Sequence, residues 1–337
     1  MRFLIVITLL RLINASNVPK SKNLPCIRYK DMIPTYACNY QINNHAKYCE
    51  NSTLYKPNTT CLCNNINWLA SVLGCLSYEG KLETKSIQGV KKFCRINGGV
   101  ELTQERVGIA YRRYIDSATD ASLTTTPGVS IIVDEPILLS SSEVHLYRRA
   151  YEKYLGNFDD SIYYGTAIYG YWTIVLLLAA VVNWGKLIFP TWSNSSLRII
   201  QKHVILPALG AKSKAQTQSL GPIEFIVPSR FEALILGLFM VLLAMLALIN
   251  TDPVEGDPIY YIKSNAQLRY VVDRPGIIST MLGPLVVLFA GRNNFLLWIT
   301  RWQHARFLTL HRWVARTMVV LALIHAIGYT RLLGTFY

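Results

Sequence analysis

Four long apolar runs occupy the second half of the chain, and each is about as long as a membrane helix. They lie at about 163–184, 231–250, 276–298 and 308–328. About 20 mostly apolar residues are enough to cross a bilayer as a helix. The run "ALILGLFMVLLAMLALI" at 233–249 contains no charged residue. The pattern predicts a mainly helical membrane domain at 161–337 with four transmembrane helices.

The first half of the chain follows a different pattern. Residues 1–15 combine a basic start, an apolar run and a small residue at the end, which is typical of a signal peptide. The alternative is a membrane anchor, and Arg11 inside the apolar run argues against it. Residues 16–160 are polar and mixed, and they are predicted to form an extracellular domain and a juxtamembrane segment. Within them, "SSSEVHLYRRAYEKYLG" at 140–156 predicts a helix that ends at Gly156.

All of the cysteines lie in the predicted extracellular domain. They are Cys26, Cys38, Cys49, Cys61, Cys63, Cys75 and Cys94. Dense cysteine behind a secretory signal is typical of a small domain stabilised by disulfides. A zinc site is the alternative, but the chain has no Cys-x-x-Cys pair. The odd number leaves one thiol without a partner, and Cys61 and Cys63 are too close in sequence to pair comfortably with each other.

Charge in the loops predicts how the helices are oriented. Residues 186–230 carry six Lys or Arg against one acid, whereas 251–275 carry four acids against three bases. Five arginines cluster around the turn between the last two apolar runs. Because basic loops stay in the cytosol, the first and third loops should lie inside and the N-terminus outside.

The glycosylation sequons agree with this orientation. Asn51 and Asn58 each begin an Asn-x-Ser/Thr triplet among the cysteines, where glycans are expected. A third triplet begins at Asn194, in a loop predicted to be cytosolic, and it should carry no glycan.

Composition supports a membrane protein. The chain of 337 residues is 51% hydrophobic and only 16% charged, whereas soluble domains are about 25% charged. Its formal net charge is +14. Basic cytosolic loops and attraction to anionic membrane lipid account for much of that charge. No nucleic-acid partner is therefore inferred.

Two histidines bracket the last apolar run, in "HRWVARTMVVLALIH" at 311–325. His311 and His325 are fourteen residues apart, which is within about 40° of four full helical turns, so both side chains project from one face. They are about 21 Å apart along the axis, one near each leaflet. Neutral imidazole is a good axial ligand of haem iron, so the pair predicts two stacked haems. The alternative is that His311 sits at the interface beside Arg312 and that His325 bonds to a neighbouring helix.

Four segments of the chain resemble one family. "CLCNNINWLASVLGCL" (61–76), "NFDDSIYYGTAIYGYW" (157–172), "GRNNFLLW" (291–298) and "FLTLHRWVARTMVVLALIHA" (307–326) are similar to segments of the fungal ferric-chelate reductases, relatives of the NADPH oxidases. The resemblance implies that cytosolic NADPH reduces FAD and that two haems b carry electrons outward. Ferric or cupric chelates would then be reduced outside, for iron or copper uptake.

The resemblance also implies roles and a location. His311 matches the ligand of the inner haem, and His325 matches the ligand of the outer haem. His45, His145, His203 and His304 match no ligand position, so we expect them at surfaces or interfaces. The plasma membrane is the implied location, with the vacuolar membrane as the alternative.

The chain departs from the family pattern after the second histidine. In the family a second helix supplies the other ligand of each haem, whereas this sequence ends at Tyr337. It contains no Gly-x-Gly-x-x-Gly loop and no room for FAD and NADPH domains. We therefore expect it to be the front part of a reductase, inactive alone. The alternative is a non-catalytic, membrane-anchored, cysteine-rich surface protein that associates with a complete relative.

Overall fold

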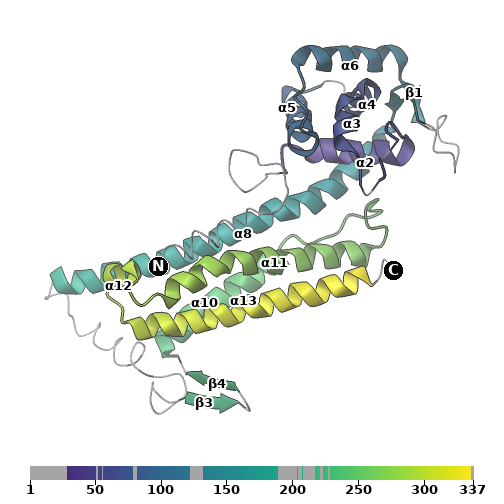
Figure 1. Cartoon of the computed structure of the whole chain (residues 1–337). Coiled ribbons are helices and arrows are strands. Elements are labelled where there is room, and N and C mark those ends of the chain that lie inside the picture. The colour runs from purple at the N-terminus through teal and green to yellow at the C-terminus, as the bar shows by residue number, and fades with distance from the viewer. Residues whose placement is uncertain are drawn as a thin grey trace. The chain divides into compact units, whose positions relative to one another are not determined.

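The computed structural model describes most of the chain. It covers residues 29–50, 52–54, 56–78, 82–121, 132–188, 203, 207, 217–220, 223–226 and 228–334. The chain divides into two compact units, Met1–Gly156 and Asn157–Tyr337, and helices dominate both (Figure 1). The predicted signal peptide at 1–15, Cys26, Asn51 and Asn194 lie outside the described residues.

The first unit consists of short helices and one small strand pair. Its elements are α2 (Ile33–His45), α3 (Thr59–Asn64), α4 (Ile66–Leu76), α5 (Thr84–Phe93), the π-helical turn η1 (Cys94–Gly98), α6 (Gln104–Ser117), β1 (Thr119–Asp120) and β2 (Ile137–Leu138). Strands β1 and β2 pair in parallel. The first part of α8 (Ser141–Ile188) completes the unit.

Helix α4 is the centre of the first unit's core. Every residue from Asn67 to Cys75 is buried, and a helix that is buried all round belongs inside a domain. Asn65 begins the helix by accepting hydrogen bonds from the backbone nitrogens of Asn67 and Trp68, at 2.8 and 3.1 Å. The Trp68 ring is fully buried, and its indole N–H donates to Asn39 at 3.2 Å. A small domain thus obtains a core from one central helix.

Three disulfides link the elements around this core. They join Cys38 to Cys75, Cys49 to Cys61 and Cys63 to Cys94. The prediction that this region is disulfide-rich is confirmed for six of the seven cysteines, and the zinc alternative is wrong for them. Cys61 and Cys63 bond to different partners, as their closeness in sequence required. These covalent links add to a hydrophobic core whose buried residues come from most elements of the unit.

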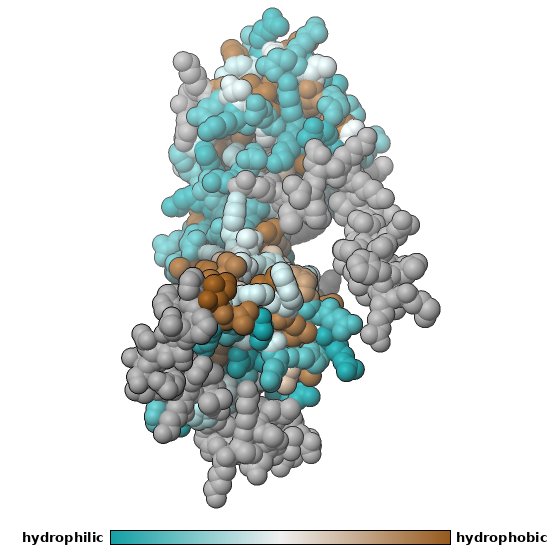
Figure 2. Space-filling view, turned by 90° about the vertical axis from the view of Figure 1, so that its left-hand side faces the viewer, coloured by the Kyte–Doolittle hydropathy of each residue, from teal (hydrophilic) through white to brown (hydrophobic). Residues whose placement is uncertain are grey.

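The second unit contains four helices long and apolar enough to cross a membrane, which confirms the predicted fold class. They are the later part of α8, α10 (Arg230–Leu248), α11 (Lys263–Ala290) and α13 (His304–Leu333). Between them lie the short helix α12 (Phe295–Thr300) and an antiparallel hairpin of β3 (Thr217–Leu220) and β4 (Ile223–Ile226). In the visible face of Figure 2 the first unit is mainly hydrophilic, whereas hydrophobic residues gather over the visible end of the second.

Two predicted helices have wrong boundaries. Helix α8 does not stop at Gly156 but continues to Ile188, because Asn157 is held in the helix by bonds to the Tyr270 carbonyl and to Arg274, at 3.2 and 2.7 Å. The third membrane helix, predicted at 276–298, begins at Lys263 and ends at Ala290. Asn294 then caps α12 by accepting from the Leu296 backbone nitrogen at 2.9 Å, so the chain turns before the apolar run is finished.

An aromatic cluster joins the four long helices of the second unit. Trp172 of α8 packs against Phe239 of α10 and Phe289 of α11, with ring centroids 5.3 and 5.0 Å apart. Phe289 in turn contacts Phe307 of α13 at 5.7 Å. All four side chains are buried. Since lipid is as apolar as these residues, close packing rather than hydrophobicity must hold the helices together here.

Buried polar groups brace both ends of α10. At its start Ser229 and Glu232 form a reciprocal capping box, and the second oxygen of Glu232 lies 3.4 Å from Arg306 of α13. Near its end Arg274 of α11 is buried and donates to the carbonyls of Leu246, Ile249 and Asn250. These bonds satisfy carbonyls that have no partner inside a helix end. The neighbours of α10 therefore fix its position.

Candidate functional site

Both predicted histidines lie on α13, on the face that packs against α11. The Nδ1 atom of His311 is 2.8 Å from the backbone oxygen of Val286, and Nδ1 of His325 is 2.7 Å from that of Val272. The two histidines are fourteen residues apart, and so are the two valines. The pairings run in opposite directions along the two helices, so α11 and α13 are antiparallel neighbours (Figure 1).

These hydrogen bonds fix the tautomer of both imidazoles. A carbonyl oxygen only accepts, so Nδ1 must carry the proton and donate it. In a neutral ring the lone pair is then on Nε2. A metal-ligating histidine typically donates its other ring N–H to a carbonyl or carboxylate in this way. Each histidine is therefore prepared to ligate a metal through Nε2.

The hydrogen bonds between α13 and α11 agree with one part of the alternative to haem ligation. His325 does bond to a neighbouring helix, as that reading required. His311 does the same rather than only facing the interface beside Arg312. The bonds use Nδ1 in both residues and leave Nε2, so helix bonding and metal ligation are compatible.

Close packing surrounds the His325 ring. A Cβ atom on Gly276 would lie 2.5 Å from its Nδ1, so only glycine fits there without a shift. The ring of Tyr329 packs against it with centroids 4.5 Å apart. Tyr329 donates its hydroxyl to Asp273, which also accepts from Arg269 at 3.0 Å. This polar cluster around His325 was not predicted from the sequence, although Asp273 follows Val272, whose carbonyl accepts from His325.

A third polar contact lies midway between the two histidines. Ser279 donates its hydroxyl to the carbonyl of Met318 at 2.9 Å. Ser279 is seven residues from Val272 and from Val286, and Met318 is seven from each histidine. Contacts at heptad spacing keep the same faces of two helices together. The sequence signal was present in Ser279, which is polar and, with Thr280, interrupts an otherwise apolar run.

The histidines fit one half of a haem-binding arrangement. Each offers one neutral imidazole, which suits one axial position of a haem iron. Within the described ranges no group of three or more His, Cys, Asp and Glu side chains could hold a metal ion by itself. Any bis-histidine haem held by this chain would thus need a second imidazole for each of the two positions.

The other four histidines have other surroundings. His145 lies 3.1 Å from the Tyr78 hydroxyl, and His45 lies 3.5 Å from the Glu143 carboxylate. The backbone oxygen of His203 accepts from Arg230 at 3.0 Å. His304 begins α13, and its buried Nδ1 has no hydrogen-bond partner among the described residues. Within the described residues, none of these four makes the Nδ1 hydrogen bond to a backbone carbonyl of α11 that His311 and His325 make.

The predicted glycan sites can be compared with the structure only at Asn58. Its side chain is exposed and begins α3, where Oδ1 accepts from the Cys61 backbone nitrogen at 3.1 Å. The bond uses the amide oxygen and leaves Nδ2, the atom to which an N-linked glycan attaches. The cap and a glycan are therefore compatible.

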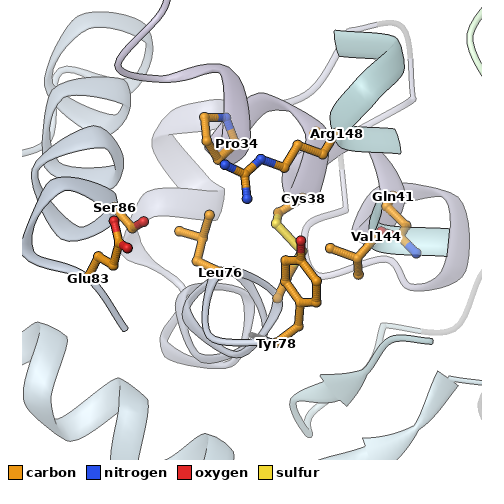
Figure 3. A pocket seen from close by; sticks show the side chains of 11 residues that line it. Pro34, Cys38, Gln41, Leu76, Tyr78, Glu83, Ser86, Val144 and Arg148 are labelled. Atoms are coloured by element: carbon orange, nitrogen blue, oxygen red, sulfur yellow. A yellow bond between two sulfur atoms is a disulfide. The ribbon is translucent and has the colours of Figure 1, made fainter. Parts of the chain in front are cut away.

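A separate polar recess lies in the first unit (Figure 3). It has a volume of about 180 Å³ and is bordered by the Cys38–Cys75 disulfide. Arg148 reaches toward it from α8, while Glu83 and Ser86 lie on the opposite side. Gln41 on its wall is fully buried, and its Oε1 accepts no hydrogen bond from the described residues. The recess suits water or a small polar molecule and contains none of the α13 imidazoles.

Comparison with known proteins places this geometry in a family context. Residues 275–335, which contain both histidines, match the family model of ferric reductase like transmembrane components. A probable ferric reductase transmembrane component of Candida albicans is 38% identical over 206 residues, which are 59% of this chain and 31% of that protein. No solved structure matches the chain.

Two further relatives carry similar names. Ferric/cupric reductase transmembrane component 1 of C. albicans is also 38% identical over 59% of this chain, and 27% of its own length is covered. Ferric reductase transmembrane component 5 of Saccharomyces cerevisiae is 29% identical over 89% of this chain and 43% of its own. The chain spans less than half the length of these relatives. The chain is similar to these fungal ferric and ferric/cupric reductase transmembrane components, and the segment that matches the family model includes parts of α11 and α13.

Proposed function

We propose that the chain is the front part of a plasma-membrane ferric/cupric-chelate reductase. In this proposal electrons pass outward from cytosolic NADPH through FAD and two haems b to ferric or cupric chelates outside the cell. His311 supplies one axial ligand of the inner haem, and His325 supplies one of the outer haem. In this proposal no residue of the present sequence is assigned to FAD or NADPH.

One observation carries the proposal. Both histidines donate Nδ1–H to backbone carbonyls of the same neighbouring helix, at 2.8 and 2.7 Å. A purely structural hydrogen bond could be made through either ring nitrogen, whereas both residues use Nδ1 and leave Nε2. Two imidazoles with Nε2 free, on one helix face and about 21 Å apart, are what two stacked haems need from one helix.

In this proposal the residues of this chain bind the haems and orient the two imidazole rings. A haem held by two imidazoles supplies one-electron transfer between ferric and ferrous iron. The Val286 and Val272 carbonyls keep the imidazole protons on Nδ1 and fix the ring planes. The close approach of α11 and α13 beside His325, where Gly276 has no room for a side chain, resists rotation of that ring.

The direction of transfer follows from the predicted topology. Cysteines that form disulfides need an oxidising compartment, so the first unit is assigned to the outside. The start of α13 then lies toward the cytosol and its end toward the outside. His325 is accordingly the ligand nearer to the metal chelate, and His311 is the one nearer to the flavin.

The experiment is a chimera that joins this chain to the remainder of the C. albicans relative. Purified in detergent, it should contain two low-spin haems per molecule. His311→Ala and His325→Ala should each remove one haem and stop NADPH-driven ferric reduction, because iron with one imidazole loses affinity and its six-coordinate spectrum. His304→Ala on the same helix is the matched control and should retain both haems. If both ligand variants keep two low-spin haems, the assignment is wrong.

Measurements on the purified chain alone test the half-site argument, and the chimera separates the reductase function from its non-catalytic alternative. With one histidine per site it should show little stoichiometric haem and no ferric reduction by itself. Two low-spin haems per purified 337-residue monomer would contradict the half-site argument. A chimera that folds, with its disulfides formed, but binds no haem would instead favour the non-catalytic, cysteine-rich surface protein.

A further inference from the structure

A long groove runs between α8 and α10 in the second unit. It has a volume of about 610 Å³, and its walls are one face of α8 from Tyr171 to Lys186 and one face of α10 from Phe231 to Leu238. Trp302 and Arg306 close one end. Side chains at three- and four-residue spacing on α8 share one helix face, so this wall is continuous. The groove is separate from the histidine face of α13.

The groove is polar at one end and apolar along the rest. Lys186, Asn183 and Arg306 gather at the closed end. Elsewhere the lining is aliphatic or aromatic, and Tyr171 at the far end is already satisfied because its hydroxyl donates to the Ile235 carbonyl at 2.6 Å. This distribution is that of an amphiphile: one charged head and a long apolar tail.

The length of the groove matches one membrane leaflet. From residue 171 to 186 a helix rises about 22 Å. Half of a hydrocarbon core of about 30 Å is about 15 Å, and the headgroup zone adds several more. The apolar wall of α8 is also open toward lipid, since Leu178 is 60% exposed and Ile174 is 59% exposed. One acyl chain and its headgroup fit this span.

The charges at the closed end favour an anionic headgroup. Arg306 is stacked on Trp302 at 4.9 Å and is paired with Glu232, so these two charges offset each other. Lys186 makes no ion pair with a described residue and gives this end one net positive charge. Lysine and arginine together are common ligands of phosphate. A neutral headgroup would leave Lys186 uncompensated at the edge of the hydrocarbon.

We propose that this groove binds one anionic phospholipid. Its phosphate lies at Lys186 and Arg306, and an acyl chain lies between α8 and α10 as far as Tyr171. The lipid would fill the space between two helices that also meet through the aromatic cluster and the Tyr171 hydrogen bond. The proposal does not depend on haem, so it stands apart from the reductase function.

The test uses the full chain, purified in detergent and equilibrated with either phosphatidylserine or phosphatidylcholine. Native mass spectrometry should show one retained phosphatidylserine and a weaker retention of phosphatidylcholine. Lys186→Gln should reduce phosphatidylserine retention about fivefold, because one basic residue at a membrane surface contributes about that factor. Lys263→Gln, which removes an exposed lysine at the start of α11, is the matched control and should change nothing.

A second variant tests the apolar part. Leu178→Trp fills the groove from an exposed position, so it should leave folding intact and abolish retention of the lipid. Equal retention of both lipids in every variant would mean that only annular lipid is bound, and the proposal would be wrong. A lipid-free dimer that Leu178→Trp disrupts would also overturn it, because a second copy would then occupy the groove.

Discussion

His325 and Val272 are joined across two helices by a hydrogen bond of 2.7 Å between Nδ1 and the backbone oxygen. The same kind of bond joins His311 to Val286, and the Ser279 bond to Met318 lies midway between them. Three contacts at seven-residue intervals on both helices define a single register. A shift of α13 along α11 would break all three together. The orientation of both imidazoles therefore depends on the packing of one helix pair.

The Ser279 contact should contribute to that register. We predict that Ser279→Ala lowers the free energy of unfolding by about 1 kcal/mol, the usual size of an interhelical hydrogen bond in a membrane protein. Thr280→Ala is the matched control, since Thr280 is exposed and bonds to the Gly276 carbonyl of its own helix. Unfolding of the purified chain in mixed detergent measures both. Equal losses in the two variants would contradict a role in register.

Gly276 should matter for the outer histidine because of space. A Cβ atom at this position would lie 2.5 Å from Nδ1 of His325 and 2.7 Å from its Cε1. We predict that Gly276→Ala in the chimera turns the ring, breaks the bond to Val272 and removes the outer low-spin haem while the inner one remains.

Gly283, two helical turns after Gly276 on the same helix, is the control for this prediction. A Cβ atom on Gly283 would meet nothing within 4 Å, so Gly283→Ala should keep both haems and gain slightly in helix stability. The haem absorbance spectrum measures both variants. A two-haem spectrum in Gly276→Ala would show that His325 needs no such clearance.

Much of the second unit could be predicted from the sequence, and the reason is physical. Long apolar runs have few alternatives to membrane helices, and the helical repeat alone puts His311 and His325 on one face. The partners of these histidines could not be predicted, because backbone carbonyls carry no residue-specific signal. The start of α11 could not be predicted from the apolar run, because the helix begins at Lys263, in a charged segment, and continues through Pro275.

The first unit was predictable in kind but not in detail. Six cysteines allow fifteen pairings, so spacing excluded the Cys61–Cys63 bond without choosing among the rest. The choice depends on which helices meet, and Cys38 reaches Cys75 only because α2 packs on the central α4. Gly156 was wrongly predicted to end α8. A glycine costs a helix about 1 kcal/mol, and the contacts of Asn157 with α11 outweigh that cost.

Tyr48 should make the stability of the first unit depend on pH in the alkaline range. Burial raises the pKa of its hydroxyl to about 12, against which the bond to Ser71 acts only in part. Because the folded state holds this proton more tightly than the unfolded state, stability is complete below pH 10 and falls as the pH rises toward 12. The slope is about 1.4 kcal/mol per pH unit for one such group.

The Tyr48→Phe variant checks this dependence. It removes the ionising hydroxyl, so the free energy of unfolding of the purified chain should fall less steeply between pH 10 and 12, even though the lost hydrogen bonds to Ser71 and the Glu135 carbonyl lower it at neutral pH. Circular dichroism of denaturant unfolding at each pH provides the measurement. An unchanged slope would mean that Tyr48 does not titrate with unfolding.

Glycan attachment should report the orientation of the whole chain. The enzyme that adds N-linked glycans works only in the lumen, and the loop charges assign residues 16–160 to that side and residues 186–230 to the cytosol. We predict that Asn51→Gln and Asn58→Gln each remove one glycan from the expressed chain, whereas Asn194→Gln leaves its mass on gels unchanged. The exposed Asn58, whose Nδ2 is not used by the α3 cap, makes this site accessible in the folded unit. If Asn194→Gln alone lowers the mass, the orientation is inverted, and His311 rather than His325 would face the metal chelate.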